Sequence, residues 1–192
     1  MNLHTNRRNL LLSLIPLFAA LTAAGAFIKI PTPLVPITLQ TLMVYLSGLF
    51  LGVRGGAVSQ LLYIVIGILG LPVFSGGGGP AYVVSPTFGY LLGFILASAV
   101  SGYFAKKGGI WWPAVGIGLS VVAIYICGVP YLYFSVNYIF GKEITVSNAV
   151  KVGFILPVFG DIIKASFALG IFYSARSILG LPITGDIGRK SG

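Results

Sequence analysis

Long apolar runs, separated by short breaks rich in glycine, proline or lysine, make up most of this sequence. The runs are continuous rather than alternating, which favours membrane-spanning helices over the strands of a β-barrel. At about 20 residues per span plus short connections, the length allows roughly five to seven helices. We expect an all-α integral membrane protein with six transmembrane helices, at about Leu10–Ile30, Thr38–Val53, Ala57–Leu71, Thr87–Phe104, Trp112–Phe134 and Lys151–Leu179.

The breaks between these runs differ in character. Three prolines in Pro31–Pro36 predict a stiff, extended connection, and Arg54-Gly55-Gly56 predicts a tight turn. Between the third and fourth helices, Pro72–Gly89 is rich in glycine and proline and carries no charge, so we expect it to fold back over the protein rather than extend into water. The whole chain, 1–192, is predicted to be one membrane domain, with polar tails at 1–8 and 180–192 around a bundle at 9–179.

Composition supports this fold class. The 192 residues are 57% hydrophobic and 8% charged, whereas soluble domains average about 25% charged residues. A net charge of +9 would suggest nucleic acid as a partner of a soluble protein, but here the basic residues flank the apolar runs and report topology instead. Lys29, Lys142 and Lys151 fall on one side of the membrane; the other side holds Arg7, Arg8, Arg54, Lys106, Lys107, Arg176, Arg189 and Lys190. This bias predicts that both termini are cytoplasmic and that the Pro31–Pro36 and Gly76–Gly79 loops are outside.

Several kinds of chemistry are excluded by what the sequence lacks. The single histidine, His4, and the single cysteine, Cys127, cannot build a metal cluster or a disulfide. No serine has a histidine to activate it, and the sequence contains no nucleotide-binding Gly-Lys-Ser/Thr ending. We therefore expect no enzyme activity, no metal, no cofactor and no ATP hydrolysis by this chain itself.

An aspartate and a lysine lie near the middle of the last apolar run, Phe154–Phe172. Each charge at that depth costs roughly 2.5–3.5 kcal/mol on insertion scales, so such residues usually mark a ligand or ion path. Asp161 and Lys164 are three apart and share a helix face, and Pro157 weakens the helix one turn earlier. The alternative is a structural ion pair that ties this helix to its neighbours.

Two further features have a functional and a structural interpretation. Gly76–Gly79 allow either a flexible turn or a close backbone approach to a ligand, with Phe74, Tyr82, Ser85 and Tyr90 around it. Small residues on the first helix, Ala19/Ala23 and Ala20/Ala24, let another helix approach closely. Spacing alone favours internal packing for these alanines.

Four segments together resemble one known family. They are Ile30–Thr41, Gly70–Gly78, Ser85–Tyr90 and Phe159–Ala165, and the resemblance extends over nearly the whole chain. The family is BioY, the biotin-specific S components of energy-coupling factor (ECF) transporters. The resemblance implies six membrane helices in a bacterial cell membrane, biotin bound from outside, a transmembrane coupling protein, and two cytoplasmic ATPases that alone use ATP. It also implies that Ala19/Ala23, or the neighbouring pair Ala20/Ala24, faces the coupling protein.

The family's Pro-Gly-Asp-x-x-Lys motif is similar to Phe159–Lys164, with Phe159 in place of proline, and its Gly-Pro-Thr-Gly-Gly-Tyr motif to Ser85–Tyr90, with Phe88 in place of glycine. The resemblance therefore implies that Asp161 and Lys164 bind biotin. As further ligand-binding residues we expect Phe74, Gly77, Gly78, Tyr82, Ser85, Thr87, Tyr90 and Gln40.

Biotin suits this set chemically, since its ureido N–H groups match Asp161 and its carboxylate matches Lys164. We expect the two outer loops to close over biotin and the loaded subunit to tilt in the membrane as the ATPases act. Alternatives are an S component for another small vitamin and a stand-alone proton-coupled carrier with Asp161 as its protonation site, against which stand the few acidic residues and the lack of an evident inverted repeat. A lipid-modifying membrane enzyme lacks every catalytic signature.

Overall fold

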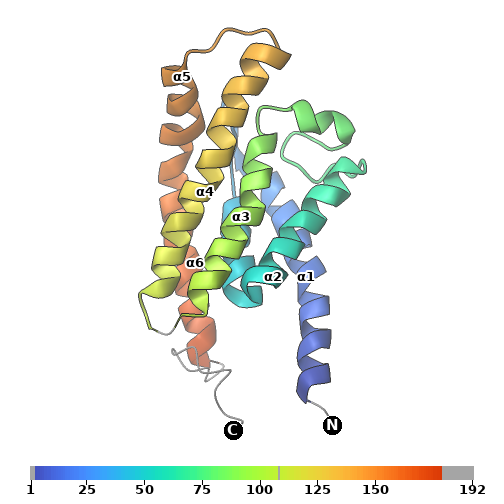
Figure 1. The fold of residues 1–192 in the computed structure, drawn as a ribbon, viewed down its shortest axis with the longest axis vertical. Coiled ribbons are helices and arrows are strands. Elements are labelled where there is room, and N and C mark those ends of the chain that lie inside the picture. The colour runs from blue at the N-terminus through green and yellow to red at the C-terminus, as the bar shows by residue number, and fades with distance from the viewer. Residues whose placement is uncertain (1–2, 108, 179–192) are drawn as a thin grey trace.

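The helices of the protein run side by side along its long axis in the computed structural model (Figure 1). The structure describes residues 3–107 and 109–178, and side chains from residue 12 onward. The predicted tail at 180–192 lies outside the described residues, and residues 3–8 of the other tail belong to the first helix. The long helices are α1 (Leu3–Phe27), α2 (Gln40–Ile68), α3 (Phe88–Ala105), α4 (Trp112–Phe134) and α6 (Leu156–Ile178).

Short elements extend or connect these helices. Strands β1 (Lys29–Ile30) and β2 (Ile37–Thr38) pair antiparallel on either side of the proline-rich turn. A 3₁₀ turn, η1 (Pro80–Val84), follows the glycines, and a π-helical turn, η2 (Ser135–Ile139), prolongs α4. The helix α5 (Val146–Val150) and the π-helical turn η3 (Lys151–Ile155) lead directly into α6, so this last helical run begins before the predicted Lys151.

Helix α2 folds back on itself at Gly52 (Figure 1). Gly52 has φ +72° inside an otherwise helical stretch, a conformation that glycine adopts without strain. In a straight helix, residues 48 and 56 would be about 12 Å apart. Here a Cβ on Gly56 would lie 2.9 Å from the Cα of Gly48, so the two arms are antiparallel neighbours. The prediction of a turn at Arg54-Gly55-Gly56 is wrong: these residues are helical, and the break lies at Gly52.

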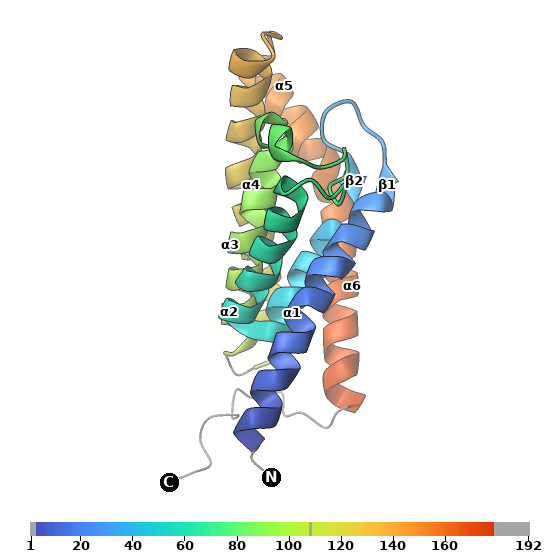
Figure 2. The same cartoon turned by 90° about the vertical axis from the view of Figure 1, so that its right-hand side faces the viewer.

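The glycine-rich segment folds back over the end of the bundle, beside the β1–β2 hairpin (Figure 2). Its Phe74 ring is 1% exposed and fills a socket against Gly67, where a Cβ would overlap the ring. The segment is also fastened to its surroundings. Lys29 Nζ donates to Ser75 O at 2.5 Å, Gly79 N to Gly67 O at 2.7 Å, and Ser135 Oγ to Val84 O at 2.6 Å. These contacts hold the segment against the bundle as a wall.

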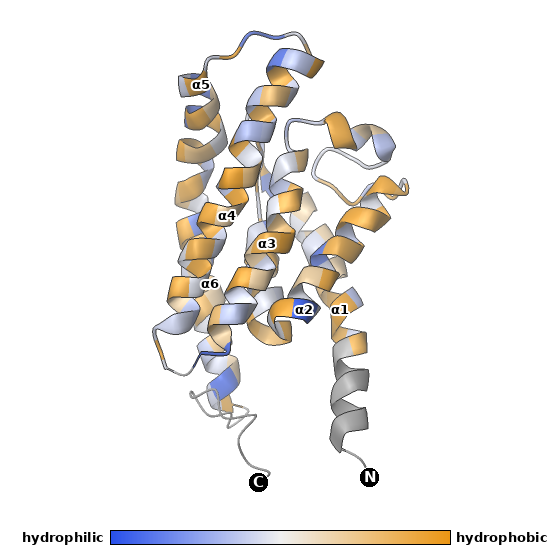
Figure 3. Cartoon of the chain, in the orientation of Figure 1, coloured by the Kyte–Doolittle hydropathy of each residue, from blue (hydrophilic) through white to orange (hydrophobic). Residues whose placement is uncertain are grey.

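Hydrophobic residues recur along all the long helices (Figure 3). Within the described residues, four helical stretches are long and apolar enough to cross a membrane: Gln40–Ile68, Phe88–Ala105, Trp112–Ile139 and Val146–Ile178. Residues Leu12–Phe27 of α1 form a shorter apolar helix. The protein is a mostly helical, multi-pass membrane protein. Helix α1 begins, and α6 ends, at the end of the bundle opposite the two loops (Figure 2).

Candidate functional site

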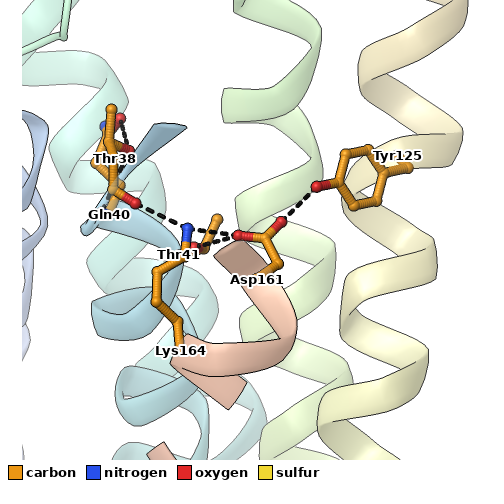
Figure 4. A network of polar contacts seen from close by, with 6 residues as sticks. All are labelled: Thr38, Gln40, Thr41, Tyr125, Asp161 and Lys164. Atoms are coloured by element: carbon orange, nitrogen blue, oxygen red, sulfur yellow. Dashed lines mark hydrogen bonds and ion pairs between the residues drawn. The ribbon is translucent and has the colours of Figure 1, made fainter. Parts of the chain in front are cut away.

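The charged pair of α6 is buried inside the bundle (Figure 4). Asp161 is 3% exposed and Lys164 7%, and Asp161 Oδ1 lies 2.5 Å from Lys164 Nζ. One helical turn places both side chains on the face that packs toward β2 and α2. Gly160 allows that approach, since a Cβ there would lie 2.9 Å from Ile37 Cγ2. The pair thus faces protein rather than lipid.

Three further elements hold this pair. Thr41 Oγ1 donates to Asp161 Oδ1 at 2.8 Å, and Tyr125 of α4 donates its hydroxyl proton to Asp161 Oδ2 at 2.5 Å. Lys164 Nζ donates to the Thr38 carbonyl of β2 at 2.8 Å. An ammonium has three N–H donors and a carboxylate about four acceptor positions. Lys164 therefore keeps one donor for a ligand, and Asp161 about one acceptor position.

A second chain of hydrogen bonds fixes Gln40 beside the pair. Thr38 Oγ1 donates to Gln40 Oε1 at 2.9 Å, and Gln40 Nε2 donates to Tyr63 OH at 2.6 Å. Tyr63 in turn donates to the Val73 carbonyl at 3.1 Å. The chain joins β2, both arms of α2 and the glycine-rich segment, so the position of the charged pair is coupled to the wall above it.

These groups line an inner cavity with about 510 Å³ of space free of protein atoms. Its walls expose mainly apolar surface, with the charged pair at one end and the hydroxyls of Ser75, Tyr82 and Thr87 elsewhere in the lining. The inner cavity is lined by Val35, Pro36, Ile37, Thr38, Gln40, Thr41, Ser75, Tyr82, Thr87, Tyr90, Leu91, Phe94, Ile124, Tyr125, Pro157, Asp161 and Lys164.

A wider outer groove of about 820 Å³ adjoins the inner cavity on the loop side. It is lined by Leu34, Pro36, Ser75, Gly76, Gly78, Ala81, Tyr82, Val84, Ser85, Thr87 and Phe140. Pro36, Ser75, Tyr82 and Thr87 line both spaces. The hydroxyls of Tyr82 and Thr87 are 2.9 Å apart, so a hydrogen-bonded side-chain pair separates the cavity from the groove.

The structure brings most of the predicted ligand-binding residues to these two spaces. Asp161, Lys164, Gln40, Tyr82, Thr87 and Tyr90 line the inner cavity, and Gly78 and Ser85 line the outer groove. Phe74 lies instead behind the wall, with its ring against Tyr63 and Tyr82. Gly77 lines neither space and exchanges backbone hydrogen bonds with Phe74.

Sequence reasoning missed several groups of the site. Thr38 and Thr41 flank Gln40 in an otherwise apolar run, and that polar cluster was a usable signal. Ser75 lies next to the predicted Phe74 and lines both spaces. Tyr125 carried no signal, because its partner Asp161 is 36 positions away. Within the described residues, no group of His, Cys, Asp and Glu side chains is arranged to hold a metal ion.

The predicted alanine pairs of α1 face different ways. Ala19 is 3% exposed and packs in the core of the chain, and Ala23 is half-buried. Ala20 and Ala24 are exposed. Of the two registers, Ala20/Ala24 is the one available to another protein, and the Ala19/Ala23 register is largely used inside the chain.

Comparisons with known proteins agree on one family. The family model described as the BioY family matches residues 1–180. A probable biotin transporter BioY from Lysinibacillus sphaericus is 45% identical over 181 residues, which cover 87% of this chain and 90% of that protein. The biotin transporter BioY of Thermotoga maritima is 41% identical over 152 residues, covering 77% and 85%. The crystal structure of the S-component for biotin from an ECF-type ABC transporter matches with a TM-score of 0.79 at 24% identity, over 92% of this chain and 95% of that chain, and so shares its fold.

Proposed function

This chain belongs to the BioY family, and from that premise we propose that it captures biotin outside the cell as the substrate-binding subunit of an ECF-type ABC transporter. The observation that carries the proposal is the buried pair Asp161 and Lys164, which faces the inner cavity with one donor and about one acceptor position still open. A neutral group of the ligand that carries a hydrogen-bond acceptor beside a donor satisfies both Lys164 and Asp161.

The spacing of the pair selects one end of biotin. The ureido ring and the carboxylate of biotin are separated by the bicyclic ring and a chain of methylene groups, whereas Asp161 Oδ1 and Lys164 Nζ are 2.5 Å apart. We therefore assign both charges to the same end of biotin, in place of the separate ends expected from the sequence. A ureido group presents N–H and C=O next to each other, as the pair requires. A carboxylate at Lys164 would instead bring its negative charge beside Asp161.

The rest of the inner cavity suits the remainder of the ring system. Leu91, Phe94 and Ile124 provide apolar surface for the thiophane ring, and Tyr90 is held in place because its hydroxyl donates to the Gly153 carbonyl at 2.7 Å. Apolar walls with a few placed polar groups are typical of small-molecule sites. Burying the bicyclic ring there stabilises the complex, while the charged pair sets its orientation.

Entry to the cavity is assigned to the proline-rich turn between β1 and β2. Val35 and Pro36 line the inner cavity, and Leu34 and Pro36 line the groove. The glycine-rich wall is held by hydrogen bonds from Lys29, Gly79 and Ser135, and we assign the movement to the turn, which lines both spaces. Closure of this turn over biotin removes water from the charged pair and strengthens its bonds to the ligand.

The arrangement in the membrane follows from the charge bias and the fold. We assign six crossings to α1, the two arms of α2, α3, α4 and α6. Both termini are then cytoplasmic and the two loops outside, because the loop end holds only three of the basic residues that flank the apolar runs, Lys29, Lys142 and Lys151. The exposed alanines Ala20 and Ala24 of α1 are assigned to the coupling protein, since small residues allow close helix contact. ATP is hydrolysed by partner subunits.

Direct binding measurements on the detergent-purified chain test this function. We expect biotin, and no other water-soluble vitamin in the same panel, to bind and to raise the unfolding temperature. Asp161→Asn and Lys164→Met should each weaken biotin binding, whereas Glu143→Gln and Lys151→Met, which change exposed charges, should not. Equal binding of another vitamin, or full biotin binding by the doubly neutral variant Asp161→Asn/Lys164→Met, would overturn the assignment.

A further inference from the structure

We infer that the outer groove is a second subsite, which holds the carboxyl end of the ligand and accepts biotin whose carboxylate is joined as an amide to an amino acid or short peptide. The inference rests on the proposed function, since it takes the ureido ring to lie at Asp161 and Lys164. With that end fixed at the bottom of the inner cavity, the acyl chain has to extend toward the wall shared with the groove.

The shared wall is made of side chains that can part. Tyr82 and Thr87 touch through their hydroxyls at 2.9 Å, and Ser75 Oγ lies 3.5 Å from Tyr82 OH. These are neutral hydrogen bonds, and the hydroxyls can re-pair with a carboxyl or amide oxygen that passes between them. A ligand whose carboxyl or amide oxygen comes within reach of the parted hydroxyls therefore replaces the lost hydrogen bonds.

The groove recognises oxygen atoms without supplying a charge. No Asp, Glu, Lys or Arg is among the described residues that line it. Its lining includes the hydroxyl-bearing residues Ser75 and Ser85 and the glycines Gly76 and Gly78, whose backbone N–H groups have no hydrogen-bond acceptor within the described part of the chain. A carboxylate oxygen and an amide carbonyl oxygen both accept from such donors. A site of this kind does not distinguish a free acid from an amide by charge.

The fold of this segment requires glycine at several positions. A Cβ on Gly78 would overlap the Leu71 carbonyl, and Gly77 and Gly79 have φ +120° and +96°, which other residues adopt only with strain. The groove is also the wider of the two spaces, about 820 Å³ against about 510 Å³. It has room for a substituent beyond the carboxyl carbon, with Leu34 and Phe140 as its apolar edges.

Competition binding with biotin, biotin methyl amide and biotinyl-lysine tests the subsite on the full-length chain in detergent. We expect both amides to compete within about tenfold of biotin. Ala81 lines the groove and not the inner cavity, so Ala81→Trp should lower the affinity for biotinyl-lysine at least tenfold more than that for biotin. Val83→Trp, a change in the same 3₁₀ turn at an exposed residue that lines neither space, is the matched control and should leave the ratio unchanged.

The outcomes separate the two proposals. If biotin itself does not bind, the proposed function fails. If biotin binds but biotinyl-lysine binds more than about tenfold more weakly, the groove is not an acyl subsite and the inference is wrong. An Ala81→Trp variant that loses biotin and biotinyl-lysine by the same factor would equally contradict a separate outer subsite.

Discussion

Removing the positive charge at Lys164 should cost the protein more stability than removing both charges together. In Lys164→Met, Asp161 stays 3% exposed and keeps only the donors Thr41 and Tyr125. Breaking a buried ion pair from one side typically costs about 3–5 kcal/mol. In Asp161→Asn/Lys164→Met no buried charge is left unpaired, and the loss should be about 1–2 kcal/mol. The double variant should therefore be about 2 kcal/mol more stable than Lys164→Met.

Binding responds in the opposite order. Each charge that bonds to the ureido group is worth about 1.5–3 kcal/mol, or roughly 10- to 100-fold in affinity. Each single variant loses one such bond, and the double variant loses both. The double variant should therefore bind biotin most weakly although it is more stable than Lys164→Met. This opposition is what distinguishes a ligand-binding pair from a purely structural one.

Reversible unfolding in mixed micelles measures stability, and biotin titration measures affinity. Both are applied to the parent, Asp161→Asn, Lys164→Met and the double variant. Lys151→Met and Glu143→Gln, at exposed positions, control for loss of charge alone. The reasoning is refuted if Lys164→Met unfolds at the same point as the parent, or if the double variant binds biotin as well as the parent does.

Three further perturbations test single features of the structure. Gly52→Ala places a side chain at φ +72° and should destabilise the fold by about 1–2 kcal/mol, whereas Gly118→Ala, in open space on α4, should not destabilise it, as thermal unfolding would reveal. Tyr125→Phe removes the 2.5 Å hydrogen bond to Asp161 and should weaken biotin binding about tenfold, as titration would measure. Tyr45→Phe removes a hydroxyl that has no hydrogen-bond partner within the described residues, and it should leave the stability of the fold unchanged or raise it. Ala20→Leu/Ala24→Leu should keep biotin binding but abolish uptake in cells that carry the partner subunits, and uptake at the parental rate would remove α1 from the coupling interface.

Apolar runs predicted the positions of the helices because burial in lipid or protein demands them. They could not place the reversal in α2, since Gly52, Gly55 and Gly56 all permit a turn. Packing places the reversal at Gly52. The backbone there lies so close to Gly102 of α3 that a Cβ on Gly102 would overlap it, whereas Gly56 lies within the second arm of α2 and allows close approach to Gly48. The choice depends on contacts between segments far apart in the chain, which no local pattern encodes.

The same distinction divides the site. Asp161 and Lys164 were predictable because a charge in an apolar run is costly anywhere in the membrane. Tyr125 was not, because one tyrosine in an apolar helix is unremarkable until the fold brings it 2.5 Å from a carboxylate. Phe74 was placed at the ligand for its position in the glycine-rich segment, yet a large apolar ring is best stabilised by complete burial, and the socket at Gly67 provides it.

The packing below the site bears on how biotin reaches the cytoplasm. On the side away from the loops, the arms of α2 meet at Gly48 and Gly56, and Gly102 of α3 packs against the backbone at Gly52. These are contacts of backbone with backbone, so no side chain can swing aside to open a path there. A straight channel would require the helices to separate and would expose backbone to water or lipid at a high cost. Moving the loaded subunit as a body leaves those contacts intact. The dense lower half of the bundle therefore favours reorientation of the whole subunit over a channel through it, and it makes the surface of α1, where a partner can act on that body, as important for uptake as the pocket itself.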